Sequence, residues 1–97
     1  LKHGMNVQVV GALLSAGDSS GPESHTVLVN GVPVVTLGSL STGQNGFAPS
    51  PAIEGSASVF VNGKPVVRAG DKYAPHSNGL IVIQETALGG AASVRVG

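Results

Sequence analysis

Apolar residues along the chain occur in short runs, and each run is interrupted by glycine, proline or an Asn-Gly pair. The longest stretch without Gly or Pro is the nine residues 80–88. Glycine weakens a helix interior by about 1 kcal/mol and proline by about 3 kcal/mol, so this pattern is unsuited to helices. The 15 valines favour strands instead. The pattern therefore predicts an all-β chain of short strands and tight turns.

One arrangement of apolar and turn residues occurs twice. Residues 26–39 and residues 58–71 are identical at half or more of their paired positions, and both contain Val-Asn-Gly followed by Pro-Val-Val. Partial copies open the chain at residues 7–18 and close it at residues 93–97. Self-similarity of this kind indicates one supersecondary unit that is used several times.

Each full copy predicts a β-hairpin. The Asn-Gly pairs at residues 30–31 and 62–63 favour two-residue type I′ turns, in which both central residues need a positive φ. Pro33 and Pro65 then fall where the missing N–H costs no bond within the hairpin. We expect repeated short hairpins that are separated by loops.

Composition narrows the function classes. The 97 residues predict one domain, residues 1–97, and five basic residues balance five acidic ones. No basic cluster exists for a nucleic-acid partner. Without cysteine there is no disulfide, thiolate nucleophile or Cys-based zinc finger. No apolar run approaches the ~20 residues of a membrane-spanning helix. A small glycine-rich domain of this kind needs another staple, such as a metal or a partner chain.

The three histidines are candidate metal ligands. His3, His25 and His76 each precede a Val- or Ile-rich segment, and the last two each follow a Gly-Asp pair, at residues 17–18 and 70–71. Equivalent loops of a repeat protein collect at one end, where three imidazoles could bind a transition metal. The alternative is that they are solvated loop residues, because their spacing has no metal-binding signature. Both interpretations stay open.

Other candidate residues point to turns and structure rather than catalysis. Asp18 and Asp71 could be paired carboxylates, but Asp after Gly is more often a turn residue. Serines precede the second histidine without a G-x-S-x-G elbow, so we assign no catalytic residue. Lys64 and Arg68 are expected on a solvated strand face, and Phe60 in the core.

Residues 55–71 resemble the repeat of the PAAR family. They read Gly-Ser-Ala-Ser-Val-Phe-Val-Asn-Gly-Lys-Pro-Val-Val-Arg-Ala-Gly-Asp, against a family pattern of G-S-x-x-V-x-V-N-G-K-P-A-A-R-x-G-D. The Pro-Ala-Ala-Arg stretch is here Pro-Val-Val-Arg at residues 65–68, and residues 33–36 are a more degenerate copy. With the partial copies, the resemblance covers nearly the whole chain.

The resemblance implies a fold and a role. PAAR proteins are small β cones with pseudo-threefold symmetry, so we expect a conical arrangement of β-hairpin repeats. They are not enzymes: one copy caps a trimeric β-helical spike, VgrG-like or of a phage tail, and aids puncture of the target envelope. The target membrane is contacted only transiently, and no nucleic acid is involved. The implied location is a phage tail tip or the secreted tip of a type VI spike, and the small size favours a stand-alone tip, slightly more a phage one.

The resemblance also implies a zinc ion at the tip, held in the family by histidines and a cysteine. This chain has no cysteine. His76 lies in the loop that matches the family's Cys/His loop, His25 follows the first Gly-Asp pair, and His3 is third by its position. We therefore expect zinc, or as second choice iron, with water, an oxygen ligand or nothing as the fourth ligand. Two alternatives are a small zinc enzyme with a three-histidine site and a metal-free structural β-repeat protein.

Overall fold

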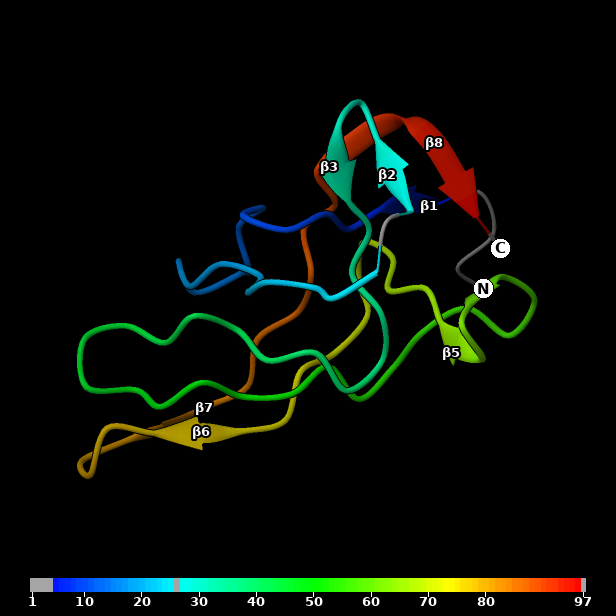
Figure 1. Cartoon of the computed structure of the whole chain (residues 1–97). Coiled ribbons are helices and arrows are strands. Elements are labelled where there is room, and N and C mark those ends of the chain that lie inside the picture. The colour runs from blue at the N-terminus through cyan, green and yellow to red at the C-terminus, as the bar shows by residue number, and fades with distance from the viewer. Residues whose placement is uncertain (1–4, 26, 97) are drawn as a thin grey trace.

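The computed structural model describes residues 5–25 and 27–96. All regular structure in these ranges is strand, which confirms the all-β prediction, and they contain no helix long and apolar enough to cross a membrane. The strands form four antiparallel pairs (Figure 1): β1 (Met5–Val7) with β8 (Ala91–Val96), β2 (Leu28–Val29) with β3 (Val32–Pro33), β4 (Phe60–Val61) with β5 (Lys64–Pro65), and β6 (His76–Ser77) with β7 (Val82–Ile83).

The two Asn-Gly pairs make the hairpin turns that the sequence predicts. Asn30 has a φ of 52° and Gly31 a φ of 80°, and the second hairpin repeats these values at 52° and 79°. Pro33 pairs with Leu28, and the next hydrogen bond of the hairpin is donated by Val34 N to the oxygen of residue 27, 3.1 Å away. The proline therefore lies at a position where its missing N–H removes no bond within the hairpin.

The partial copies at the two chain ends are halves of a single third unit. Met5 pairs with Val96 and Asn6 with Arg95, in the register that joins β3 to β2 and β5 to β4. The third hairpin is thus closed by two strands from opposite ends of the chain.

Three central segments form a closed ring of backbone hydrogen bonds. Gln8 N donates to Val67 O over 3.0 Å, Val67 N donates to Val35 O over 2.8 Å, and Val35 N donates to Gln8 O over 2.9 Å. All three residues are completely buried. The pseudo-threefold axis of the molecule passes through this ring. Gln8, Val35 and Val67 are therefore equivalent positions of the three units.

The hydrogen-bond ring changes how residues 7–18 align with the two full copies of the repeat. Counting three residues on from the ring, Gly11, Gly38 and Gly70 are equivalent, and their φ values are 83°, 89° and 88°. The Gly-Asp pair at residues 17–18 is therefore not the counterpart of the pair at residues 70–71. The weak similarity of residues 7–18 to the full copies allowed either alignment, and the ring hydrogen bonds decide it.

Three arms extend from the ring and form a second closed ring. We define the first arm as residues 12–20, the second as residues 39–52 and the third as residues 71–88. Bridges join the two sides of each arm and also join each arm to the next: Leu13–Ser19, Ser20–Ser41, Leu40–Pro51, Ala52–Tyr73, Lys72–Thr86 and Leu14–Ala87. Six short segments thus surround the axis without an open edge.

The core follows the axis in two layers. One apolar cluster lies beside the hairpins, and the other lies inside the arms and includes Tyr73, which is fully buried. The molecule measures 37 × 28 × 23 Å. In Figure 1 the three hairpin units gather at one end, here called the wide end, and the β6–β7 pair lies at the opposite, narrow end. The members of the two clusters are Val7, Val9, Val34, Val61 and Val66, and Leu14, Val35, Ala52, Val67, Tyr73 and Ala87.

Two sequence predictions about side chains are wrong. Phe60 is 51% exposed rather than part of the core, because it lies on the short β4–β5 hairpin outside both clusters. Arg68 is only 9% exposed rather than solvated, because its Nε donates to Asp71 Oδ2 at 3.0 Å inside the fold. Lys64 is exposed as predicted.

Candidate functional site

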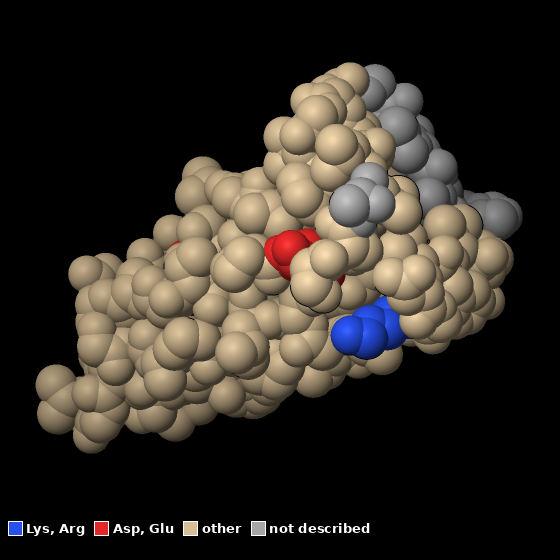
Figure 2. Space-filling view, in the orientation of Figure 1, with Lys and Arg blue, Asp and Glu red and all other residues tan. Residues whose placement is uncertain are grey.

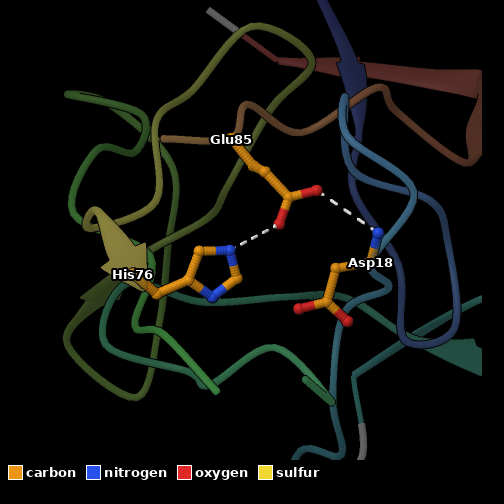
Figure 3. A group of neighbouring side chains, drawn as sticks. All are labelled: Asp18, His76 and Glu85. Carbon is orange, nitrogen blue, oxygen red and sulfur yellow. Dashed lines mark hydrogen bonds and ion pairs between the residues drawn. The ribbon is translucent and has the colours of Figure 1, made fainter. Parts of the chain in front are cut away.

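Three buried ionisable side chains meet inside the arms. Asp18 comes from the turn of the first arm, while His76 on β6 and Glu85 after β7 come from the third arm (Figure 3). One ligand atom of each lies within 4.8 Å of the others, and the three residues are 1%, 7% and 0% exposed. The bridge between Leu14 and Ala87 brings these two arms together. We call this group the axial cluster.

The ring of His76 is held in one orientation. Its Nδ1 lies 2.6 Å from Ala48 O, and because a carbonyl only accepts, Nδ1 donates the hydrogen. The ring of Phe47 packs against the imidazole with 4.9 Å between centroids. Nε2 is left facing Glu85 Oε1 at 3.1 Å, and neither of these buried atoms has a hydrogen-bond partner among the described residues.

This contact requires a cation. A neutral imidazole that donates from Nδ1 has a lone pair on Nε2, and this lone pair faces a carboxylate oxygen. The two repel each other unless a proton or a metal ion lies between them. A histidine that donates Nδ1–H to a carbonyl and presents Nε2 is also the usual arrangement of a metal ligand.

Glu85 is fixed by the first arm. Its Oε2 accepts hydrogen bonds from Ala16 N at 2.9 Å and from Asp18 N at 3.2 Å. These two backbone donors orient the carboxylate so that the other oxygen, Oε1, points at His76 (Figure 3). The turn of the first arm therefore positions a side chain that the third arm supplies.

Asp18 completes the axial cluster as a carboxylate. Burial alone raises its pKa, but hydrogen bonds from the Ser41 side chain, Ser19 N, the Thr42 hydroxyl and Gly43 N outweigh burial and leave the pKa below the ordinary 3.8. Thr42 Oγ1 donates to Oδ1 at 2.8 Å and Gly43 N to Oδ2 at 3.1 Å. Asp18 thus joins the first and second arms, which extends the turn role that the sequence predicts for it.

The predicted histidine ligands have different surroundings. His76 belongs to the axial cluster, whereas His25 does not. His25 Nδ1 accepts from Val27 N at 3.0 Å, so Nε2 carries the hydrogen and donates to Val34 O at 2.8 Å. Its Nε2 also lies 3.3 Å from Glu23 Oε1. His3 lies outside the described residues, and the three-histidine set stays a prediction.

The sequence does not predict that Asp18 and Glu85 belong to one site. Asp18 follows a glycine, which is typical of a turn residue, and Glu85 is a single acidic residue with no motif around it. The signal for Glu85 is its position: it is the one charged residue in the longest stretch free of Gly and Pro, residues 80–88. A carboxylate that such a segment buries needs partners, but the sequence does not say which arm provides them.

The wide end carries a second feature, a set of exposed apolar side chains. They occupy equivalent places before the Asn-Gly turns of two units: Val27 and Leu28 in one, and Val59 and Phe60 in the other, with exposures of 46%, 53%, 37% and 51%. We call these four residues the hairpin face.

The family model described as PAAR motif matches residues 8–75 of this chain. That match spans more than half of the sequence, so the chain belongs to the PAAR family. A search of curated proteins gave no match. The family is one of structural proteins that serve as spike tips in contractile injection systems and associate with a spike, in phage tails and in type VI secretion.

Proposed function

We propose that this chain caps the blunt end of a trimeric β-helical spike, with one copy per trimer. The observation that carries the proposal is the closed hydrogen-bond ring of Gln8, Val35 and Val67. A trimer presents three equivalent sets of strands around one axis. A single chain matches all three only if it has a threefold arrangement of its own, and the three hairpin units around the ring supply one.

The hairpin face supplies the contacts. The outer sides of β3 and β5 are already used, because Pro33 O and Pro65 O accept hydrogen bonds from Val10 N and Leu37 N. Among the described strands, β2 pairs only with β3 and β4 only with β5, so strands of a partner can continue β2 and β4 by backbone hydrogen bonds at their other edge. Leu28 and Phe60 add apolar area at equivalent places in two units. The role is mechanical: a rigid tip concentrates the force of sheath contraction on a small area of the target envelope, and no catalysis is needed.

Mixing the protein with the trimeric spike β-helix from the same source tests this proposal. We expect a complex with the mass of one chain per trimer in size-exclusion chromatography with light scattering. Leu28→Asp combined with Phe60→Asp should weaken it at least tenfold, since both side chains lose apolar contact. Leu40→Asp is the matched control, because Leu40 is also 53% exposed but lies on the second arm. No complex, or a complex with more than one chain per trimer, contradicts the proposal.

We also infer that the axial cluster binds a divalent metal ion, zinc in the first place and iron in the second. The unpartnered atoms His76 Nε2 and Glu85 Oε1 and the carboxylate of Asp18 fit such an ion, because imidazole and carboxylates are ligands for both metals. When bound, the ion would cross-link the first and third arms. The set His3, His25 and His76 is the alternative, and it requires His25 to give up its bonds to Val27 and Val34.

Burial supports a structural rather than a catalytic centre. The axial cluster is at most 7% exposed, which leaves a substrate no access to the metal-ligating atoms. The surface hollow of about 340 Å³ is lined by other residues, among them Glu23, Ser39 and Lys64. The location that goes with this role is the tip of a phage tail or of a secreted type VI spike.

A further inference from the structure

The turn between β6 and β7, together with the first residue of β7, presents three consecutive apolar side chains to solvent. Leu80 is 90% exposed, Ile81 56% and Val82 69%, and Leu80 is the most exposed of the large apolar residues described. This turn lies at the narrow end, opposite the three hairpin units (Figure 1). The apolar group therefore lies at the end of the molecule opposite the hairpin face.

The backbone donors of this turn are already satisfied within it. Gly79 N donates to Ser77 Oγ at 3.0 Å. Leu80 N and Ile81 N both donate to Asn78 Oδ1, at 2.9 and 3.0 Å, and Asn78 N donates to Ile81 O at 3.3 Å. An N–H without a partner is costly to move out of water, so a turn that satisfies its own donors is suited to an apolar environment.

The narrow end also lacks charge. Residues 73–84 contain no Asp, Glu, Lys or Arg, and the one histidine among them, His76, is buried. Figure 2 shows the narrow end, at the lower left, without charged side chains on this face. No charged group there would have to lose its hydration on entering hydrocarbon, and none would attract anionic headgroups.

We propose that residues 78–82 insert into the apolar part of a lipid bilayer. This inference rests on the proposed function, because only a chain docked by its hairpin face carries the opposite end to the target membrane first. A stable protein interface is a poor alternative, since three aliphatic side chains offer roughly a few hundred Å², below the ~800 Å² per partner of a typical interface. The partner is thus the lipid, recognised by its hydrocarbon rather than by its headgroup.

A single tryptophan reports the insertion, because the chain has none of its own. Leu80→Trp should show a blue-shifted emission with phosphatidylcholine vesicles, and brominated lipid should quench it. Raising the salt from about 50 to about 500 mM should leave the shift unchanged, since no charge attraction is involved. Leu28→Trp, at the hairpin face, is the control and should not shift. No shift up to millimolar lipid, or a shift only with anionic lipid, overturns the proposal.

Vesicle flotation of the chain without tryptophan completes the test. Leu80→Ser should lower the vesicle partition coefficient by about tenfold, because one buried leucine side chain contributes that much to partitioning. Leu13→Ser is the matched control, with 58% exposure on the first arm, and should bind as the parent does. Self-association of the parent that Leu80→Ser abolishes, without vesicle binding, would identify a second copy as the partner and overturn the proposal.

The same variants separate this proposal from the capping role. Leu80→Ser should bind the trimeric spike as tightly as the parent, and Leu28→Asp should bind vesicles as well as the parent. A parent that binds vesicles but no spike contradicts the capping role alone. A parent that binds the spike but no vesicles contradicts the insertion alone.

Discussion

Nε2 of His76 lies 3.1 Å from Oε1 of Glu85, in the interior of the arms. The hydrogen bond from His76 Nδ1 to Ala48 O and those from Ala16 N and Asp18 N to Glu85 Oε2 hold the two side chains in this contact from opposite sides. The fold thus aims His76 Nε2 and Glu85 Oε1 at one point, where a proton or a metal ion has to lie between them. The metal that we propose there accounts for the arrangement.

Glu85→Gln tests this metal directly. The amide keeps the shape of the side chain and accepts the same backbone hydrogen bonds, but it removes the ligand charge. We expect the bound metal to fall to about a tenth of the parent's content or less, measured by elemental analysis. Removal of metal by a chelator should lower the Tm of the parent by about 10 °C and leave the Tm of the variant unchanged.

Glu54→Gln is the matched control for this variant, because Glu54 accepts a hydrogen bond from Lys72 N outside the axial cluster. His25→Ala should also retain the metal. Loss of metal in His25→Ala would instead favour the three-histidine set, and a parent that takes up no metal when loaded would contradict both.

Asp18→Asn should change the acid stability of the metal-free protein. The pKa of Asp18 is lowered in the fold below 3.8, so its charged form stabilises the native state at pH values above the unfolded pKa. That contribution is lost as the pH falls through the lower, folded pKa. We expect the variant to have a smaller free energy of unfolding at pH 7, and the difference from the parent to shrink below about pH 3.8. Urea titrations between pH 2 and pH 7 measure this, and a constant difference at all pH values would contradict it.

The buried pair of Arg68 and Asp71 makes a second stability prediction. Arg68 Nη2 reaches Asp71 Oδ1 at 3.1 Å and Gly55 O at 3.0 Å, and Asp71 is fully buried. Arg68→Ala leaves that carboxylate without its counter-charge, and we expect a loss of about 3 kcal/mol or more in urea unfolding. Lys64→Ala, on the exposed edge of the same unit, should change the free energy of unfolding by less than about 0.5 kcal/mol. Equal losses in the two variants would contradict a buried ion pair.

Two glycine substitutions distinguish close packing from local strain. A Cβ on Gly21 would lie 2.4 Å from Leu40 O, which already accepts the hydrogen bond of Gly21 N between the first and second arms. Gly21→Ala should therefore cost about 2 kcal/mol or more. A Cβ on Gly31 would have no neighbour within 4 Å, so the only penalty for alanine there is the φ of +80°. Gly31→Ala should therefore lower the free energy of unfolding by about 1 kcal/mol. Thermal unfolding measures both, and a larger Tm decrease for Gly31→Ala would contradict the packing at Gly21.

The sequence predicted the fold where the backbone preference of a single residue decides the local structure. Asn30 and Gly31 form the predicted turn because positive φ is a local property, and Pro33 lies at a position without a hairpin bond for the same kind of reason. The burial of Arg68 and the exposure of Phe60 were not predictable, because burial depends on neighbours from other units. The sequence pattern does not distinguish a strand face that meets a carboxylate from one that meets water.

The axial cluster was predictable only at His76. Glu85 reaches His76 across the β6–β7 pair of the same arm, in which His76 pairs with Ile83. Asp18 is brought to them by bridges between the first and third arms, such as Leu14–Ala87, which join residues far apart in the chain. No spacing in the sequence marks these bridges, since each depends on the closure of the whole ring.

By itself, the sequence determined that this protein is built from short β-hairpins of a repeated unit, because its turn residues and valines restrict the backbone locally. Only the tertiary structure decided that the two chain ends form one unit between them, since β1 and β8 meet only when the ring of Gln8, Val35 and Val67 closes. The same closure buries Asp18, His76 and Glu85 together. Closure depends on hydrogen bonds and packing between distant segments, and those are properties of the folded chain.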